Sequence, residues 1–187
     1  MDDKRLNNFL FTGDYSFAEE LIREYENNLY SLCRRLARSR EDADDLYQQT
    51  WLKAMQNAGS YKSKSFRNWL YTICVNTYKD QCRRAKSREK VTNDHLDTGA
   101  KDYAIESATD GVSAESVAID NYTKAMLKAK ISRLPDKHRL PVVLHYFEGM
   151  DYKECASALG IPVGTIKSRL NSAKKKLLEE MEKTEVV

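Results

Sequence analysis

The sequence lacks a long apolar segment, a signal-peptide core and any paired-cysteine motif. No apolar run approaches the roughly 18 residues of a membrane span, and the N-terminus MDDKRLNNFL has neither the hydrophobic centre nor the cleavage pattern of a secretory signal. These absences predict a cytoplasmic protein. The four cysteines show no C-x-x-C spacing, so we expect reduced, buried thiols without a disulfide framework or metal site; they are Cys33, Cys74, Cys82 and Cys155.

Motifs of the common enzyme classes are missing as well. The chain has no P-loop, no G-x-S-x-G turn, no metal-ligand spacing and no histidine paired with a nucleophile. We therefore expect no enzyme activity, no cofactor and no small-molecule substrate.

Charge is abundant but unevenly placed. Charged residues make up 32% of the chain and hydrophobic residues 41%, a balance typical of a soluble, folded, helix-rich protein. The net charge is only +3, yet five of the eight residues 83–90 are basic, and residues 164–178 hold five basic and no acidic residues. A mostly acidic stretch, residues 94–120, separates them. Such clusters indicate anionic partners more strongly than the net charge does.

Apolar residues recur at helical spacing in the N-terminal half, and no strand-like alternation is found anywhere. The spacing predicts a long helix over residues 17–37, a second helix after the capping signal at residues 39–42 that ends near Gly59, and a third helix capped by Ser65. Residues 92–114 hold glycine, serine, threonine and scattered acids, with too few spaced apolar residues to bury a face. They are predicted to be a linker.

Helical periodicity resumes near residue 115. Residues 134–136 (LPD) mark a break, and Pro141 predicts that the next helix is short, or irregular before that proline. Asp151 begins a capping box, Gly160 stops that helix, and a last helix follows with Ile166 in its inward stripe. The sequence thus predicts an all-α protein of two small helical domains, residues 1–91 and 115–187, joined by a flexible acidic linker, residues 92–114.

The segment IPVGTIKSRL places a tight turn ahead of a helix with small polar and basic residues in its first two turns. A short helix, such a turn and a second helix form the helix-turn-helix pattern. The helix N-terminus suits a phosphate, Gly164 permits close approach, and lysine or arginine reaches phosphates or guanine edges. A merely solvated basic helix at the end of a bundle remains the alternative, and the lysines at residues 174–176 also suit a helix C-terminus.

Three segments together resemble bacterial sigma factors of the extracytoplasmic-function type. The segment from Leu134 to Leu177 resembles the family's fourth conserved region, DADDLYQQTWLKA its polymerase-binding helix, and SFRNWLYTICVNTYKDQCRR its promoter-opening helix. The likeness covers nearly all of residues 17–178, in the family's order. It implies binding to core RNA polymerase and to promoter DNA. It also makes an anti-sigma protein, often membrane-bound in this family, a candidate partner that would hold the chain at the membrane.

The resemblance assigns residues to three surfaces. Those implied to contact the polymerase clamp are Asp42, Asp44, Asp45, Leu46, Gln48, Gln49 and Trp51. Helix capping by the acids and core packing by Trp51 are simpler accounts of the same residues. Those implied to capture the opened minus-10 strand are Ser60, Tyr61, Lys62, Lys64, Tyr71, Asn76, Lys79 and Arg83, with Tyr71 as a stacking surface. Trp69 is interpreted as core.

Those implied to read the minus-35 duplex are Thr165, Lys167, Ser168, Arg169, Asn171 and Lys174. Ser172 stands where the family often has a basic residue, which implies one contact fewer. The main rival is a helix-turn-helix regulator whose N-terminal bundle senses a partner or dimerises; the polymerase-binding and promoter-opening segments argue against it. A sigma-like adaptor or decoy is a further alternative.

Overall fold

The protein is built from helices, as predicted. The computed structural model describes residues 15–58, 61, 65–92 and 126–185, and no strand occurs in this part of the chain. Residues 126–133 are helical, and the other elements are α2 (Tyr15–Leu36), α3 (Arg40–Gln56), α4 (Phe66–Thr92), α6 (Asp136–Val142), the π-helix η2 (Val143–Phe147), α7 (Tyr152–Leu159) and α8 (Val163–Glu185). Of the predicted linker, only Thr92 lies within the described residues.

Local capping signals set the helix starts of the N-terminal half. The Ser39 hydroxyl accepts a hydrogen bond of 3.0 Å from the Asp42 backbone N–H, so Ser39 caps α3 as predicted. Ser65 accepts a longer bond of 3.3 Å from the Asn68 N–H at the start of α4. The apolar stripes of α2, α3 and α4 then bury one another, with Leu29, Leu46 and Leu70 fully enclosed.

Pro141 marks an irregular segment in the C-terminal half. Helix α6 is only seven residues long, which confirms a short helix, but the irregularity follows the proline and does not precede it. Pro141 has no N–H to donate, and its ring displaces the carbonyl one turn earlier. From Val143 the backbone takes the wider π spacing, in which the Glu148 N–H bonds the Val143 carbonyl at 3.1 Å.

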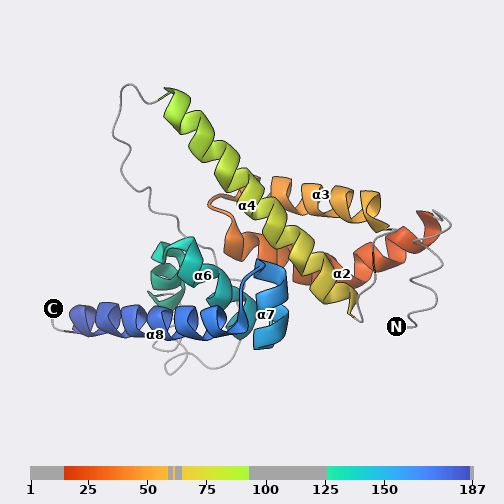
Figure 1. Ribbon diagram of the computed structural model, residues 1–187. Helices are drawn as coiled ribbons and strands as arrows, with labels where there is room; N and C mark the ends of the chain where they lie inside the picture. Colours follow the sequence, from red (N-terminus) through yellow and green to blue (C-terminus); the bar gives the residue numbers. More distant parts are fainter. Residues whose placement is uncertain (1–14, 59–60, 62–64, 93–125, 186–187) are drawn as a thin grey trace, which may run out of the picture.

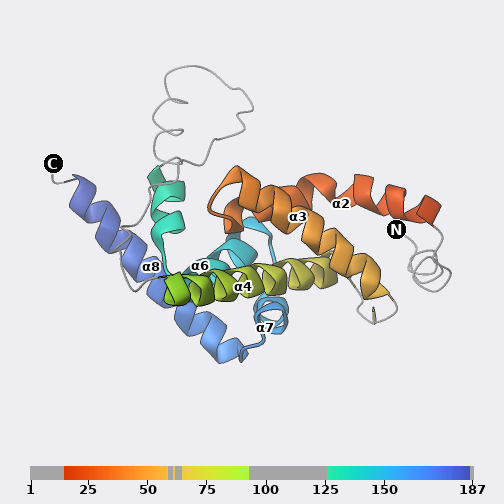
Figure 2. The same cartoon turned by 90° about the horizontal axis from the view of Figure 1, so that it is seen from above.

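The two halves contact each other along α4. In both views α3 and α7 lie on opposite sides of α4 (Figures 1 and 2), so this helix is covered on two flanks. The buried apolar residues of both halves form one continuous cluster, which includes Val75 of α4 and Cys155 of α7. The sequence predicted the two helical units but not this contact between them.

Arg139 of α6 is the most heavily bonded residue of this joint. Its guanidinium, in a residue only 6% exposed, donates to the carbonyls of Arg35 and Leu36 at 3.1 and 3.0 Å. These carbonyls end α2 and have no partner within that helix. The guanidinium also bonds the Tyr78 hydroxyl of α4 and, at 2.9 Å, the Asp136 carboxylate. The Arg139 guanidinium therefore interacts with the negative end of the α2 dipole and links α6 to both α2 and α4.

Further polar contacts join the two halves. The buried Glu148 carboxylate pairs with the Arg35 guanidinium at 2.8 Å, and the Glu148 carbonyl accepts from Arg67. Asn68 of α4 donates its amide to Glu154 of α7. Lys79 donates to the Leu159 carbonyl at 2.9 Å, at the end of α7. The joint thus consists largely of helix ends and charge pairs laid over a shared apolar cluster.

The cysteines lie as the sequence predicted, mostly inside the fold. Cys33 and Cys74 meet between α2 and α4 with their Sγ atoms 3.7 Å apart, Cys155 is buried in α7, and Cys82 is partly exposed. The Cys74 contact together with burial raises the pKa of the Cys33 thiol, and burial raises the pKa of Cys155 to about 11. Both groups therefore remain protonated, and hence weakly nucleophilic, at neutral pH.

Thiol labelling tests this arrangement. At pH 8 the native protein should be alkylated by iodoacetamide first at Cys82, and at the other three cysteines only after denaturation, because those three are buried and Cys33 and Cys155 have raised pKa values. Peptide mass spectrometry over time gives the order. Labelling of Cys155 at the rate of Cys82 would contradict its burial in α7.

Replacing Arg139 by methionine tests the joint. The substitution leaves the Arg35 and Leu36 carbonyls without their donor, and we expect the free energy of unfolding to fall by about 2–4 kcal/mol. Urea unfolding measures this loss, and faster hydrogen exchange in the last turn of α2 locates it. The matched control is Lys137→Met, an exposed cation of the same helix, expected to change stability by no more than about 0.5 kcal/mol. Equal effects of both substitutions would refute the assigned role.

Candidate polymerase and promoter interfaces

The predicted polymerase-contact residues divide between the surface and the interior of α3. Asp42, Asp45 and Gln48 are exposed, and Gln49 is partly so. The Asp45 carboxylate accepts from Gln49 at 2.8 Å and from Gln81 of α4 at 2.9 Å, so it is held in place while staying open to solvent. These residues thus form an exposed acidic and amide face of α3, the helix that lies on the flank of α4 opposite α7 (Figure 2).

Three of these predicted residues are tied inward. Leu46 is fully buried and Trp51 is 8% exposed, because both belong to the stripe of α3 that packs on α2 and α4. Their burial agrees with core packing, the simpler account of Trp51, and their direct contact with the polymerase stays a prediction. Asp44 is partly buried and accepts a 2.7 Å hydrogen bond from the Tyr30 hydroxyl, which raises the pKa of Tyr30. These three residues fix the orientation of α3 through their contacts with the rest of the N-terminal half.

Two apolar residues of this face were missed by the sequence reasoning. Leu52 is 56% exposed and Met55 is 37% exposed. Both continue the line of Asp45 and Gln48 at three- and four-residue spacing, so one side of α3 carries acid, amide and then apolar groups. The signal was present in the sequence, since Leu52 falls outside the inward stripe.

The α4 residues predicted for the minus-10 strand are also divided. Asn76 and Arg83 are exposed, and Arg83 forms an ion pair with Asp80 on the same helix. Lys79 is partly buried at the joint, where it bonds the Leu159 carbonyl. Burial, then the charges of Arg169 and Arg83, lower the pKa of Lys79. Lys79, predicted to contact the minus-10 strand, therefore lies close to Arg169, predicted to contact the minus-35 duplex.

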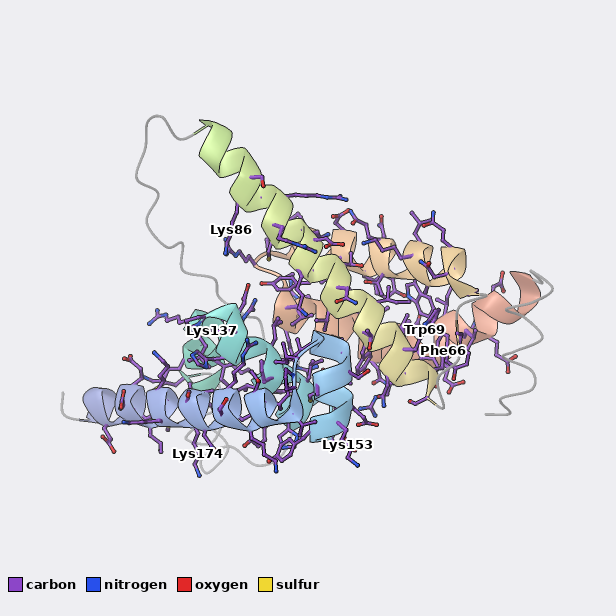
Figure 3. All side chains as sticks on the ribbon, viewed as in Figure 1. Phe66, Trp69, Lys86, Lys137, Lys153 and Lys174 are labelled. Atoms are coloured by element: carbon purple, nitrogen blue, oxygen red, sulfur yellow. The ribbon has the colours of Figure 1, made fainter. Side chains whose placement is uncertain are left out.

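The aromatic residues predicted for the minus-10 strand lie inside the fold. Tyr71 is 1% exposed and lies under the Arg67 guanidinium, 5.3 Å from ring centroid to Cζ, so it offers no stacking face in this arrangement. Tyr61 is 8% exposed and packs edge-on against Phe66 and Trp69, whose side chains gather near the start of α4 (Figure 3). Trp69 is partly buried, in accord with a core role. Ser60, Lys62 and Lys64 lie outside the described residues.

Helices α7 and α8 form the predicted helix-turn-helix. The Asp151 carboxylate accepts from the N–H groups of Lys153 and Glu154, while the Glu154 carboxylate accepts from the Asp151 N–H, completing the capping box. Gly160 ends α7 with φ +67°, a left-handed conformation that favours glycine, as predicted. A Cβ built on Gly164 would meet nothing within 4 Å, so no contact inside the described fold requires a glycine there.

The outward face of α8 carries most of the predicted minus-35 residues. Ile166, Leu170 and Ala173 are buried, as expected for the inward stripe. The predicted readers are exposed at Lys167, Ser168, Asn171 and Lys174, and partly exposed at Thr165 and Arg169. Figure 3 shows Lys174 and Lys153 extending from the lower edge of the molecule, away from α4.

Within the part of the chain that the structure describes, no cluster of three or more side chains suited to a metal ion is found. None of the helices there is both long and apolar enough to cross a membrane.

Comparison with known proteins bears on both halves. The family model for sigma-70 region 2 matches residues 21–88, and that for sigma-70 region 4 matches residues 124–177. The chain is 31% identical over 175 residues to the ECF RNA polymerase sigma factor SigE of Mycolicibacterium smegmatis, covering 92% of this chain and 65% of that relative. It is 28% identical to SigW of Bacillus subtilis, over 90% of this chain and 91% of the relative. It is 30% identical to SigM of Mycobacterium tuberculosis, over 88% and 77%.

Solved structures share the fold. The sigma factor RpoE of Bartonella quintana, in complex with the anti-sigma factor NepR, matches with a TM-score of 0.71 and 26% identity over 90% of this chain and 98% of that one. CnrH, in complex with the cytosolic domain of CnrY, matches with a TM-score of 0.64 and 20% identity over 96% and 97%, a likeness of fold alone. Family models, relatives and fold agree: the chain belongs to the extracytoplasmic-function sigma factors of RNA polymerase.

Proposed function

We propose that residues 1–91 bind core RNA polymerase and the opened minus-10 strand, that residues 115–187 read the minus-35 duplex, and that residues 92–114 link them. Sigma factors direct promoter-specific initiation and are initiation factors; we infer that this chain makes no covalent change and acts in the cytoplasm, where polymerase and chromosome are found. The observation that supports this most directly is the match of region 2 and region 4 in that order on one chain.

The polymerase-binding surface is the exposed face of α3. Asp42, Asp45 and Gln48 supply polar and acidic contacts, and we add Leu52 and Met55 as the apolar part of the same face. Acids steer the encounter with a basic partner, whereas apolar residues that become buried supply most of the binding energy. Leu46 and Trp51 act from below by fixing the helix on α2 and α4.

The promoter-binding surfaces are the outer faces of α4 and α8. On α4, Asn76 and Arg83 are available, and Lys79 becomes available when α7 moves away. On α8, Lys167, Ser168 and Asn171 face solvent beside Gly164, whose empty surroundings leave room for a DNA backbone. Lysine and arginine set the position on phosphates, and the polar side chains reach base edges.

Reading both promoter elements requires the joint to open. The minus-10 and minus-35 elements lie about 25 base pairs apart, which is about 85 Å of duplex at 3.4 Å per step. In the described arrangement Lys79 of α4 touches the end of α7, one turn before α8. Residues 93–125 could span about 110–120 Å if fully extended, so the connection is long enough for separation. An anti-sigma protein that binds both halves is a candidate partner for the closed form.

Run-off transcription tests the function. Core polymerase free of other sigma factors, given this protein and a promoter library, should start transcripts from a defined subset. The variant Gln48→Ala with Leu52→Ala should bind core about tenfold more weakly, because a polar and an apolar contact of the α3 face are removed together. Competition binding to core gives the affinity.

Asn28→Ala, an exposed polar change on α2, is the control and should bind core as the unmodified chain does. If the unmodified protein neither binds core polymerase nor starts any transcript, yet protects duplex DNA in a footprint by itself, it is a helix-turn-helix regulator and not a sigma factor. Unchanged core affinity in the double variant would remove the α3 face from the interface.

Salt dependence tests the α8 face. Replacing Lys167 and Arg169 by alanine should weaken duplex binding and reduce the slope of log affinity against log salt by about 0.9 for each lost phosphate contact. Lys137→Ala removes a single positive charge from α6, across α8 from Lys174 in Figure 3, and should leave the slope nearly unchanged. An unaltered slope in the double variant would exclude both residues from the reader.

A further inference from the structure

An aromatic group lies beside the minus-35 reader and belongs to no surface assigned so far. His145 of η2 packs its ring 4.8 Å from the ring of Tyr146 and 4.8 Å from the ring of Tyr152, measured between centroids. The His145 Nδ1 lies 2.8 Å from the Met150 carbonyl, at the entry to α7. Tyr152 is the first residue of α7 and is 37% exposed.

The irregular backbone of η2 provides this placement. Residues 143–147 follow Pro141 in the wider π spacing, and the chain reverses through Gly149 at φ +66° before α7 begins. His145, four residues after the proline, thereby faces the first turn of α7, where its bond to Met150 fixes the ring. Single π turns occur often at functional sites, because they redirect one or two side chains without ending the helix.

The Tyr152 ring lies next to Lys167, one of the residues proposed to contact the minus-35 duplex. The Lys167 Nζ lies 5.8 Å from the centroid of the Tyr152 ring, within the range of a cation–π contact. Among the described residues no carboxylate forms an ion pair with Lys167. The nearest acids along α7, Asp151 and Glu154, are engaged in the capping box. The aromatic ring is therefore the group that holds this ammonium.

A ring suits this task better than an acid would. A carboxylate partner would neutralise the ammonium and repel an approaching phosphate, whereas the π face restrains the ammonium and leaves its positive charge intact. Restraint matters because a free lysine side chain loses about 1.5–2 kcal/mol of rotamer entropy when it is ordered. A lysine already ordered on a ring loses less of this entropy when DNA binds.

We propose that Tyr152 is a positioning residue for minus-35 binding: its ring, backed by His145, holds the Lys167 ammonium where it meets a DNA phosphate. This rests on the proposed function of the α8 face. The reader accordingly depends on η2 and the first turn of α7 as well as on α8. Within the described residues the Tyr152 hydroxyl makes no hydrogen bond, so the ring and not the hydroxyl carries the role.

Duplex binding by ring variants tests the proposal. The full chain is titrated against a fluorescent mixed-sequence duplex of about 30 base pairs over a salt series, and affinity is read from anisotropy. Tyr152→Leu should weaken binding about two- to fivefold, the range expected for a cation–π contact. Tyr152→Phe should restore most of that loss, and Tyr152→Trp, with the stronger π face, should restore it fully or exceed it.

A double-mutant cycle separates positioning from mere folding support. In a Lys167→Ala background Tyr152→Leu should have little further effect, because the lysine it positions is absent. A loss of the same size in that background, or no loss from Tyr152→Leu alone, overturns the proposal. Tyr152→Leu should also keep the salt slope that Lys167→Ala reduces, since the lysine still reaches the phosphate at lower occupancy. If the unmodified chain binds no duplex in any salt, the proposed minus-35 function itself fails.

Discussion

The contact of Arg139 with the end of α2 is the interaction on which the arrangement of the two halves depends. Its guanidinium supplies donors to two carbonyls that α2 cannot satisfy by itself, and it does so in a buried place where an unpaired carbonyl or an unpaired cation would each be costly. Elsewhere in the joint, Glu148 forms an ion pair with Arg35, and Lys79 donates a hydrogen bond to the last carbonyl of α7. Because these contacts use formal charges and helix ends, they specify one relative orientation, whereas an apolar surface alone would accept several.

This dependence on polar groups also explains how one protein serves two binding tasks. A joint between halves that is rich in charged and backbone groups can exchange its bonds for bonds to water more easily than an apolar core can. Under the proposed function, the same residues are then available to another partner. Lys79 illustrates the exchange. At the joint its ammonium donates to the Leu159 carbonyl at the end of α7. Burial together with Arg169 lowers the pKa of Lys79, so the charged form is less stable at the joint than in solvent or beside a phosphate.

Local signals in the sequence correctly predicted where helices begin and end, because short-range hydrogen bonds determine these positions. Ser39, the Asp151 capping box and Gly160 were correct because each satisfies neighbouring backbone groups within a few residues. Tyr71, which the resemblance implied as a stacking surface, is buried in this arrangement because α4 is covered on two flanks, whereas a helical stripe identifies only one. Leu46, implied by the resemblance as a polymerase contact, lies on the buried side of α3, because the family pattern marks a helix and does not separate its faces. Arg139 gave no local signal, because it acts over more than a hundred residues of chain. Pro141 predicted a short or irregular helix but not the π-helix that follows it. The assignment of individual residues to polymerase and promoter stays a prediction.

The use of helix ends as docking points fixes the lengths of two helices. The carbonyls that Arg139 and Lys79 contact lie in the last turns of α2 and α7, and each added or removed residue rotates the terminus by about 100° and shifts it by about 1.5 Å. An insertion inside the last turn of α2 or of α7 would turn the terminal oxygens away from their cations even if every side chain were kept. A change of helix length at these two corners would therefore break the joint, whereas a change of the side chain alone leaves the backbone oxygen in place.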